Sequence, residues 1–234
     1  MAPKAARAAA AGGCGCIFIG ILGLVLFMGA IFAYTSIVAE ETWFLPGEAA
    51  HFDPVAAFDQ VQDHAGPGAR LVRFEARFVR ADGTLDLTAT YRPAPTAEYT
   101  FARPLASPPK NAPPLGTGRR PDDSWFEPVT VKVSRPWEFR SVSRSDGGVR
   151  TRYQYFNLGM AREAQRPQSG PEPAFAARPS CALRDFWKVA EGGGASGDSV
   201  AVVDYDAAGY RFRIEGTPID LAFGPDCGPR PARP

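Results

Sequence analysis

Histidines and close pairs of aspartates are the residues of this chain whose types suit catalysis or metal binding. His51 and His64 are its two histidines, and neither has a cysteine or a second histidine at the spacing of a zinc-binding motif. The sequence also lacks the Gly-x-Ser-x-Gly elbow of serine hydrolases and a phosphate-binding glycine loop ahead of a helix. We therefore expect no metal site and no cofactor.

Four aspartates stand in two close pairs, Asp122-Asp123 and Asp204-x-Asp206. Paired carboxylates hydrolyse glycosidic bonds when they face each other at the right separation in space. Beside a turn, however, Asp-x-Asp more commonly bonds its own backbone, and Ala208 occupies the next ligand position of a calcium loop. A hydrolase that uses Asp or Glu residues is therefore the alternative function. It requires these aspartates to meet His64 or one another in a cleft.

The segment that must position everything else is an apolar run, residues 17–39, with no charge between Arg7 and Glu40. About 20 helical residues cross the hydrocarbon core of a bilayer. We predict a single transmembrane helix over 17–39 after a short cytoplasmic N-terminus, residues 1–16. Basic residues precede the run and acidic residues follow it, which places residues 40–234 outside the cytoplasm. Trp43 would then lie at the membrane interface.

A cleaved signal peptide is the alternative, since Ile37-Val38-Ala39 resembles a cleavage site. The apolar core is longer than the roughly 7–15 residues usual for signal peptides, so we favour the uncleaved anchor. The lipid bilayer is the partner that this anchor requires. Gly29 and Ala33 form a pair of small residues that would allow weak homo-oligomerisation through the helix, although such pairs are common in glycine-rich segments.

Charge and cysteine content support an exported domain. Residues 40–234 hold 24 basic and 25 acidic side chains, so the domain has no positive field for nucleic acid. Cys181 and Cys227 bracket the last folded segment, and an oxidising compartment would join them in a disulfide; two free thiols are the alternative. The bias toward alanine, arginine, proline and glycine suggests a bacterial source, hence the periplasmic side of an inner membrane.

Hydrophobic periodicity predicts an α+β fold, in which the membrane helix precedes an antiparallel β-rich domain with two amphipathic helices. Residues 40–103 are predicted to form a helix over 52–64 and a β-meander with strands over 71–80 and 84–91. Residues 104–121 are rich in proline and are expected to form a linker or loop. A central β-hairpin segment follows over 122–162, and then a loop over 163–180.

Residues 181–227 are the best patterned unit, with a helix, a strand, a tight turn and two further strands, and 228–234 are expected to be a disordered tail. The order of elements repeats that of the first unit, with Phe58 aligned on Phe186 and Val61 on Val189. Either the chain contains an internal repeat or two common helix–hairpin units coincide.

Aromatic residues concentrate in the central β segment, where Trp125, Trp137, Tyr153 and Tyr155 form a candidate binding surface. We nevertheless favour the interpretation that most of them are core residues, because a half-buried sheet needs large side chains. The leading hypothesis is a single-pass, membrane-anchored extracytoplasmic module of the cell envelope. It would bind or assemble with an envelope protein, without a catalytic motif.

Overall fold

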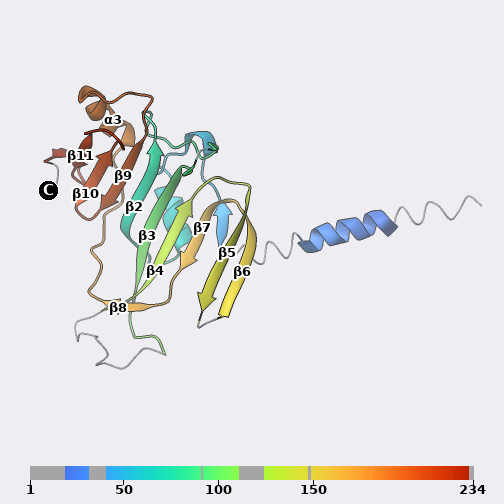
Figure 1. Cartoon of the computed structure of the whole chain (residues 1–234). Coiled ribbons are helices and arrows are strands. Elements are labelled where there is room, and N and C mark those ends of the chain that lie inside the picture. Colours follow the sequence, from blue (N-terminus) through green and yellow to red (C-terminus); the bar gives the residue numbers. More distant parts are fainter. Residues whose placement is uncertain (1–18, 32–40, 91, 111–123, 147–148, 232–234) are drawn as a thin grey trace, which may run out of the picture. The chain divides into compact units, whose positions relative to one another are not determined.

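The computed structural model describes residues 19–31, 41–90, 92–110, 124–146 and 149–231 (Figure 1). The chain divides into two units. One unit comprises residues 41–138 and 157–234, and the other comprises residues 1–40 and 139–156. The description below takes each unit by itself.

The larger unit is built on one antiparallel sheet with the strand order β1-β7-β4-β3-β2-β9-β10-β11-β12, in which β8 also pairs with β4. Every neighbouring pair of described strands in this sheet is antiparallel, as the sequence predicted. The strands are β1 (Thr42–Phe44), β2 (Arg70–Val79), β3 (Thr96–Leu105), β4 (Ser124–Val133), β7 (Gly159–Ala164), β8 (Gln168–Gly170), β9 (Ala201–Asp206), β10 (Gly209–Arg213), β11 (Asp220–Phe223) and β12 (Pro229–Arg230).

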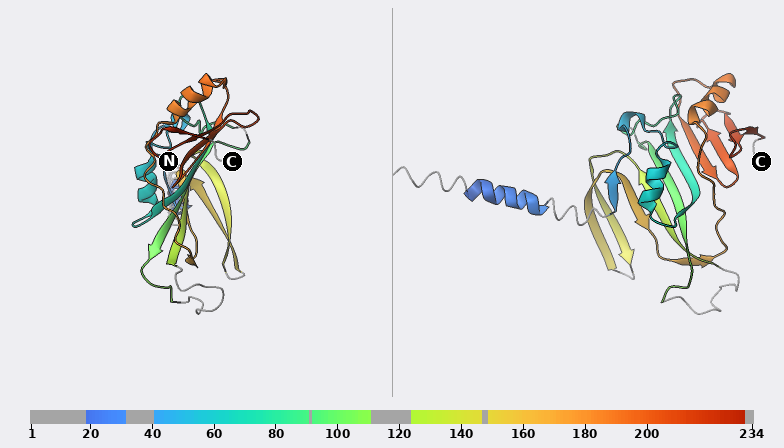
Figure 2. Two further views of the ribbon diagram at one scale, coloured as in Figure 1. Left: turned by 90° about the vertical axis from the view of Figure 1, so that its left-hand side faces the viewer. Right: turned by 180° about the vertical axis from the view of Figure 1, so that it is seen from behind.

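One face of this sheet is apolar and carries both helices of the unit, α2 (Phe58–Ala65) and α3 (Leu183–Gly192), as the edge-on view in Figure 2 shows. Alternation along the strands turns Phe74, Tyr99 and Tyr205 to this face, where each is at most 1% exposed. A short 3-10 helix, η1 (Ala49–His51), precedes α2. The α+β class with two amphipathic helices is therefore confirmed for this unit.

Each helix has one apolar stripe that packs on the sheet, and a local feature that begins or ends it. Asp53 Oδ1 accepts hydrogen bonds from the backbone of Val55 (2.9 Å) and Ala56 (3.0 Å), which caps the turn before α2. In α3, Phe186 stacks on Phe223 with ring centroids 4.1 Å apart. Burying one such aromatic ring contributes about 4–6 kcal/mol at 25 cal/mol per Å².

The strand expected over 84–91 does not form in its described residues, 84–90. Asp82 Oδ1 accepts the backbone N–H of Thr84 (2.9 Å), and Asp86 Oδ1 accepts that of Thr88 (3.0 Å). These bonds fold the segment into successive turns, because the aspartate side chains take backbone donors that a ladder would need. Leu85 is still fully buried, so the apolar pattern of this segment indicates buried side chains and does not indicate a strand.

The proline-rich segment begins later than expected. Pro104 lies inside β3, opposite Phe126 of β4. The pairing of β3 with β2 ends at Ala102, opposite Arg70, so β3 has one free side at Pro104 and the missing N–H is tolerated. The rest of the expected linker is described only as far as residue 110.

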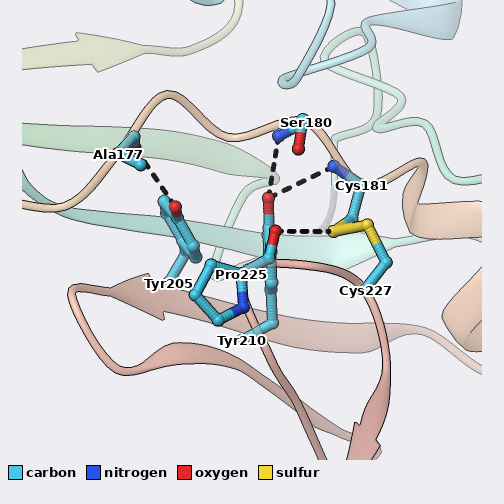
Figure 3. Close-up of a disulfide and its surroundings, with 7 residues drawn as sticks. All are labelled: Ala177, Ser180, Cys181, Tyr205, Tyr210, Pro225 and Cys227. Atoms are coloured by element: carbon cyan, nitrogen blue, oxygen red, sulfur yellow. Dashed lines mark hydrogen bonds between the residues drawn. A yellow bond between two sulfur atoms is a disulfide. The ribbon is translucent and has the colours of Figure 1, made fainter.

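The disulfide between Cys181 and Cys227 is confirmed, with a Cα–Cα distance of 5.6 Å (Figure 3). Beside it, the hydroxyl of Tyr210 accepts hydrogen bonds from the backbone N–H groups of Ser180 (3.0 Å) and Cys181 (3.3 Å). The bridge therefore ties the start of α3 to the end of the sheet. The elements between the two cysteines match the predicted helix, strand, turn and two strands.

The two predicted repeat units lie next to each other in the sheet. The order β3-β2-β9-β10 places the strands of the first unit beside those of the last, and β2 pairs directly with β9. Phe58 and Phe186 are both buried, but the alignment also matches fully buried Val61 with Val189, which is 46% exposed. Common ancestry of the two units stays a prediction.

The smaller unit contains a two-stranded hairpin, β5 (Glu138–Asp146) with β6 (Val149–Asn157), and a helix over residues 19–31. In the hairpin, the rings of Phe139 and Phe156 pack edge to face, with centroids 5.5 Å apart. Within the described residues, no helix combines the length and hydropathy needed to cross a membrane. Residues 17–18 and 32–39 of the expected transmembrane helix lie outside the described residues.

Candidate functional site

The two histidines are far from the expected catalytic arrangement. His51 is exposed, and its Nδ1 lies 3.7 Å from the Asp82 carboxylate and 3.1 Å from Nη2 of Arg80. His64 is half-buried at the end of α2, where its ring packs on Trp43 with centroids 5.2 Å apart. Burial of the ring lowers the pKa of His64 and the charge of Arg162 lowers it further, while a backbone hydrogen bond with Glu41 acts in the opposite direction. His64 is therefore neutral at pH 7.

The aspartates of β9 lie on the polar face of the sheet and do not meet His64. Asp204 accepts hydrogen bonds from Arg73 (2.5 Å) and Arg213 (2.8 Å), and Asp206 caps its turn by accepting the N–H of Ala208 (2.7 Å). Asp122 and Asp123 lie outside the described residues. No cluster of three or more potential metal ligands occurs among the residues that the structure describes.

The polar face of the sheet carries a ladder of charges. Glu98, Glu75 and Asp204 stand directly opposite one another on β3, β2 and β9. Arginines neutralise this acidic row: Arg73 bridges Glu75 and Asp204, and Arg77 bonds the other oxygen of Glu75. Like charges directly opposite would otherwise destabilise the pairing. The arginines therefore have a structural role in the sheet.

Near the end of the sheet this face is hollowed into a groove of about 570 Å³. In the wall of this groove, Arg211 makes a bidentate interaction with Asp220. Its Nε donates to Oδ1 at 2.9 Å and its Nη2 donates to Oδ2 at 2.5 Å. That hydrogen bond, reinforced by the positive charges of Arg211 and Arg213, holds the pKa of Asp220 below its ordinary value. Charged side chains of the groove are Arg73, Asp204, Asp206, Arg211, Arg213, Asp220 and Arg230.

The predicted aromatic surface is not one surface. Trp125 is only 6% exposed, and its strand β4 pairs there with both β3 and β8, at Leu105 and Ser169. Trp137 is 69% exposed. Tyr155 is half-buried in β6, and Tyr153 belongs to the same strand with a side chain outside the description. Trp125 is therefore a core residue, as we favoured for most of these aromatic residues, and Trp137 is not. A binding surface at these positions stays a prediction.

Two exposed aromatic residues of β1 lie near the turn that holds Trp137, and one of them contacts it. Trp43 and Phe44 on β1 are 49% and 60% exposed, and the rings of Phe44 and Trp137 pack edge to face with centroids 6.3 Å apart. We call Trp43, Phe44 and Trp137 the aromatic corner. Its members come from the edge strand β1 and from the turn that follows β4.

A buried asparagine holds the backbone under this corner. Asn157 is fully buried, and its Nδ2 donates to Ser134 Oγ and to the carbonyl of Arg135, each at 2.9 Å. Its Oδ1 accepts the N–H of Gly159 (3.0 Å), and its carbonyl accepts the N–H of Trp137 (2.6 Å). The network fixes the turn that presents the Trp137 side chain to solvent.

The backbone of Trp137 is strained. Its φ is +61°, a left-handed conformation that costs a bulky residue about 1–2 kcal/mol. Backbone strain of this kind persists only where the surrounding structure enforces it, and it concentrates at functional positions. The sequence contains no marker of this conformation, so sequence reasoning identified Trp137 only as one aromatic among several and missed the supporting Asn157.

Comparisons with known proteins give no further identification. No protein-family model matches this chain, no curated protein is significantly similar to it, and no solved structure matches its fold. The functional conclusion therefore comes from the residues and the geometry described above.

Proposed function

We propose that this protein is a single-pass, membrane-anchored extracytoplasmic module of the cell envelope that binds or assembles with an envelope protein. The observation that carries the proposal is the helix over residues 19–31. It has no charged residue, and its large apolar side chains are between 47% and 73% exposed. Exposing such an apolar surface to water is unfavourable, whereas contact with lipid tails is favourable. A helix also makes its backbone hydrogen bonds internally, as the lipid core requires.

The disulfide supports the extracytoplasmic side. Cys181 and Cys227 are joined in the larger unit, and disulfides persist in oxidising compartments. The basic residues Lys4 and Arg7 before the apolar run favour a cytoplasmic N-terminus. Both observations support the proposal that the folded domain lies on the periplasmic side of an inner membrane.

Membrane fractionation of the full chain tests the anchor. We expect the full chain to stay in the pellet after alkaline carbonate washing and the matched chain 41–234 to be soluble. Cys181 and Cys227 should resist alkylation until a reductant is added. Recovery of the uncleaved full chain in the soluble fraction would reject the anchor, and a mature N-terminus near residue 40 would establish the signal-peptide alternative.

The polar face of the sheet is the surface that the helices leave open to a partner. Glu98 on β3 is exposed and belongs to the charged row of this face, whereas Val189 is exposed on α3. The helix α3 covers the other face of the sheet (Figure 2). A photo-crosslinking amino acid at position 98 of the anchored chain should yield a defined envelope-protein adduct, and the same group at 189 should not. Equal labelling from both positions would reject this face as the binding surface.

A further inference from the structure

The aromatic corner remains unexplained by folding. Trp43, Phe44 and Trp137 leave 49%, 60% and 69% of their surfaces exposed, although the core of the same domain holds many fully buried aromatic residues. Phe44 and Trp137 contact each other, whereas Trp43 lies on the opposite face of β1 and packs on His64. The fold holds Trp137 in this position through a left-handed backbone and the Asn157 network. A cluster of exposed aromatic residues on an enforced backbone indicates a surface with a partner.

The length of the connecting chain limits how far the aromatic corner can lie from the end of the apolar run. Trp43 and Phe44 follow the last residue of the apolar run, Ala39, by four and five residues. At about 3.5 Å per residue, the backbone places them no more than about 14 Å and 18 Å from the end of that run. Trp137 contacts Phe44, with ring centroids 6.3 Å apart, so it lies close to this membrane-proximal strand.

The chemistry of the corner suits the boundary between lipid tails and headgroups. Tryptophan and other amphipathic aromatic residues are enriched at that depth of the bilayer, where the ring is apolar and the indole N–H meets water or headgroups. Arg135, two residues before Trp137, is exposed and supplies a positive charge for lipid phosphate.

We propose that the aromatic corner docks on the outer surface of the same bilayer that holds the N-terminal anchor. This inference rests on the proposed anchor. Docking through β1 and the Trp137 turn would attach the domain to the membrane at a second place, and so fix which face of the sheet points away from the lipid.

Tryptophan fluorescence of the full chain in lipid nanodiscs tests the proposal. Of the four tryptophans, Trp125 and Trp187 are 6% and 1% exposed and serve as internal references. Lipids brominated near the headgroup should quench a large part of the wild-type emission. Trp137→Phe should remove part of the quenched emission, Trp43→Phe another part, and the double variant should show almost none.

The outcomes separate this proposal from the anchor. If the chain incorporates into nanodiscs and W137F leaves the quenched fraction unchanged, the docking proposal is overturned while the anchor stands. If the chain fails to incorporate, the anchor and the docking proposal both fail. Lipid-independent shielding of Trp137 in a dimer, detected at two copies per disc, would assign the corner to self-association and overturn lipid docking. The matched control is Val189→Ala, an exposed apolar position on α3 that should not alter quenching.

Discussion

Gly159, at the start of β7, is the position where the packing under the aromatic corner can be tested most directly. Its φ is +118°, and a Cβ added there would lie 2.5 Å from the Cβ of Leu45 and 3.0 Å from the Leu45 Cα and N. Leu45 cannot simply move away, because its N–H donates to the carbonyl of Leu158 at 2.9 Å. Gly159→Ala must therefore displace the backbone that follows Phe44.

Gly66→Ala is the matched control. Gly66 ends α2 with φ +101°, and nothing lies within 4 Å of an added Cβ. Both substitutions force alanine into the left-handed region, which costs about 1–2 kcal/mol. Only Gly159→Ala adds overpacking, at about 1–3 kcal/mol. We expect it to lower the free energy of unfolding by about 2–5 kcal/mol in total.

Urea unfolding of the full chain in detergent measures the difference. With a slope near 2 kcal/mol per M, the additional cost of Gly159→Ala lowers the unfolding midpoint about 0.5–1.5 M below that of Gly66→Ala. Hydrogen exchange should show the extra opening at β1, which pairs with β7 through Phe44 and Gly159. Equal midpoints for the two variants would refute the close packing at this corner.

Three further results are expected from the same unfolding assay. The paired change Cys181→Ser and Cys227→Ser should cost about 4 kcal/mol on the chain-entropy model for a separation of 46 residues, and an unchanged midpoint would contradict it. His64 has a folded pKa below its ordinary 6.5, so the unfolded chain binds more protons. The contribution of neutral His64 to the free energy of unfolding is therefore present above pH 6.5 and is lost as the pH falls toward the folded pKa. His64→Gln should make the free energy of unfolding less dependent on pH in this range. An unchanged pH dependence would show that His64 does not cause it. Asn157→Ala should cost about 3 kcal/mol, because three side-chain hydrogen bonds are lost and their buried partners remain, and the fluorescence anisotropy of Trp137 should fall. A native-like anisotropy would separate the Asn157 network from the presentation of Trp137.

Local patterns in the sequence predicted the C-terminal part of the fold well. In residues 181–227 the apolar period changes from helix to strand at a run of glycines, and a turn at Asp206–Gly209 separates two strands. All the pairings among β9, β10 and β11 are between neighbours in the sequence, so local signals suffice. The same local signals failed at 84–91, where Asp82 and Asp86 bond the backbone and override the alternation.

The aromatic corner depends on contacts that no local pattern contains. Phe44 and Trp137 are far apart in the sequence and meet because β1 pairs with β7 and the turn after β4 is bonded to Asn157. The positive φ of Trp137 could not be predicted either, because the position holds neither glycine nor asparagine, the residues that commonly adopt it. The pairing of Trp125 with β8 was also not predicted, because β8 is a three-residue strand without a clear pattern.

The groove with its arginines and the aromatic corner are the two exposed features of the larger unit discussed above. They differ in whether the stability of the fold explains why their residues are there. The β2–β9 pairing brings Glu75 opposite Asp204, and the sheet requires nearby cations to hold that pair together. Arg73 and Arg213 meet this requirement, so their presence does not indicate an anionic ligand. The aromatic corner satisfies no comparable requirement, since exposing Trp137 on a strained backbone only lowers the stability of the isolated domain. Folding alone therefore explains the arginines of the groove. It does not explain the exposed aromatic side chains of the aromatic corner, which require an interaction with something outside the folded domain.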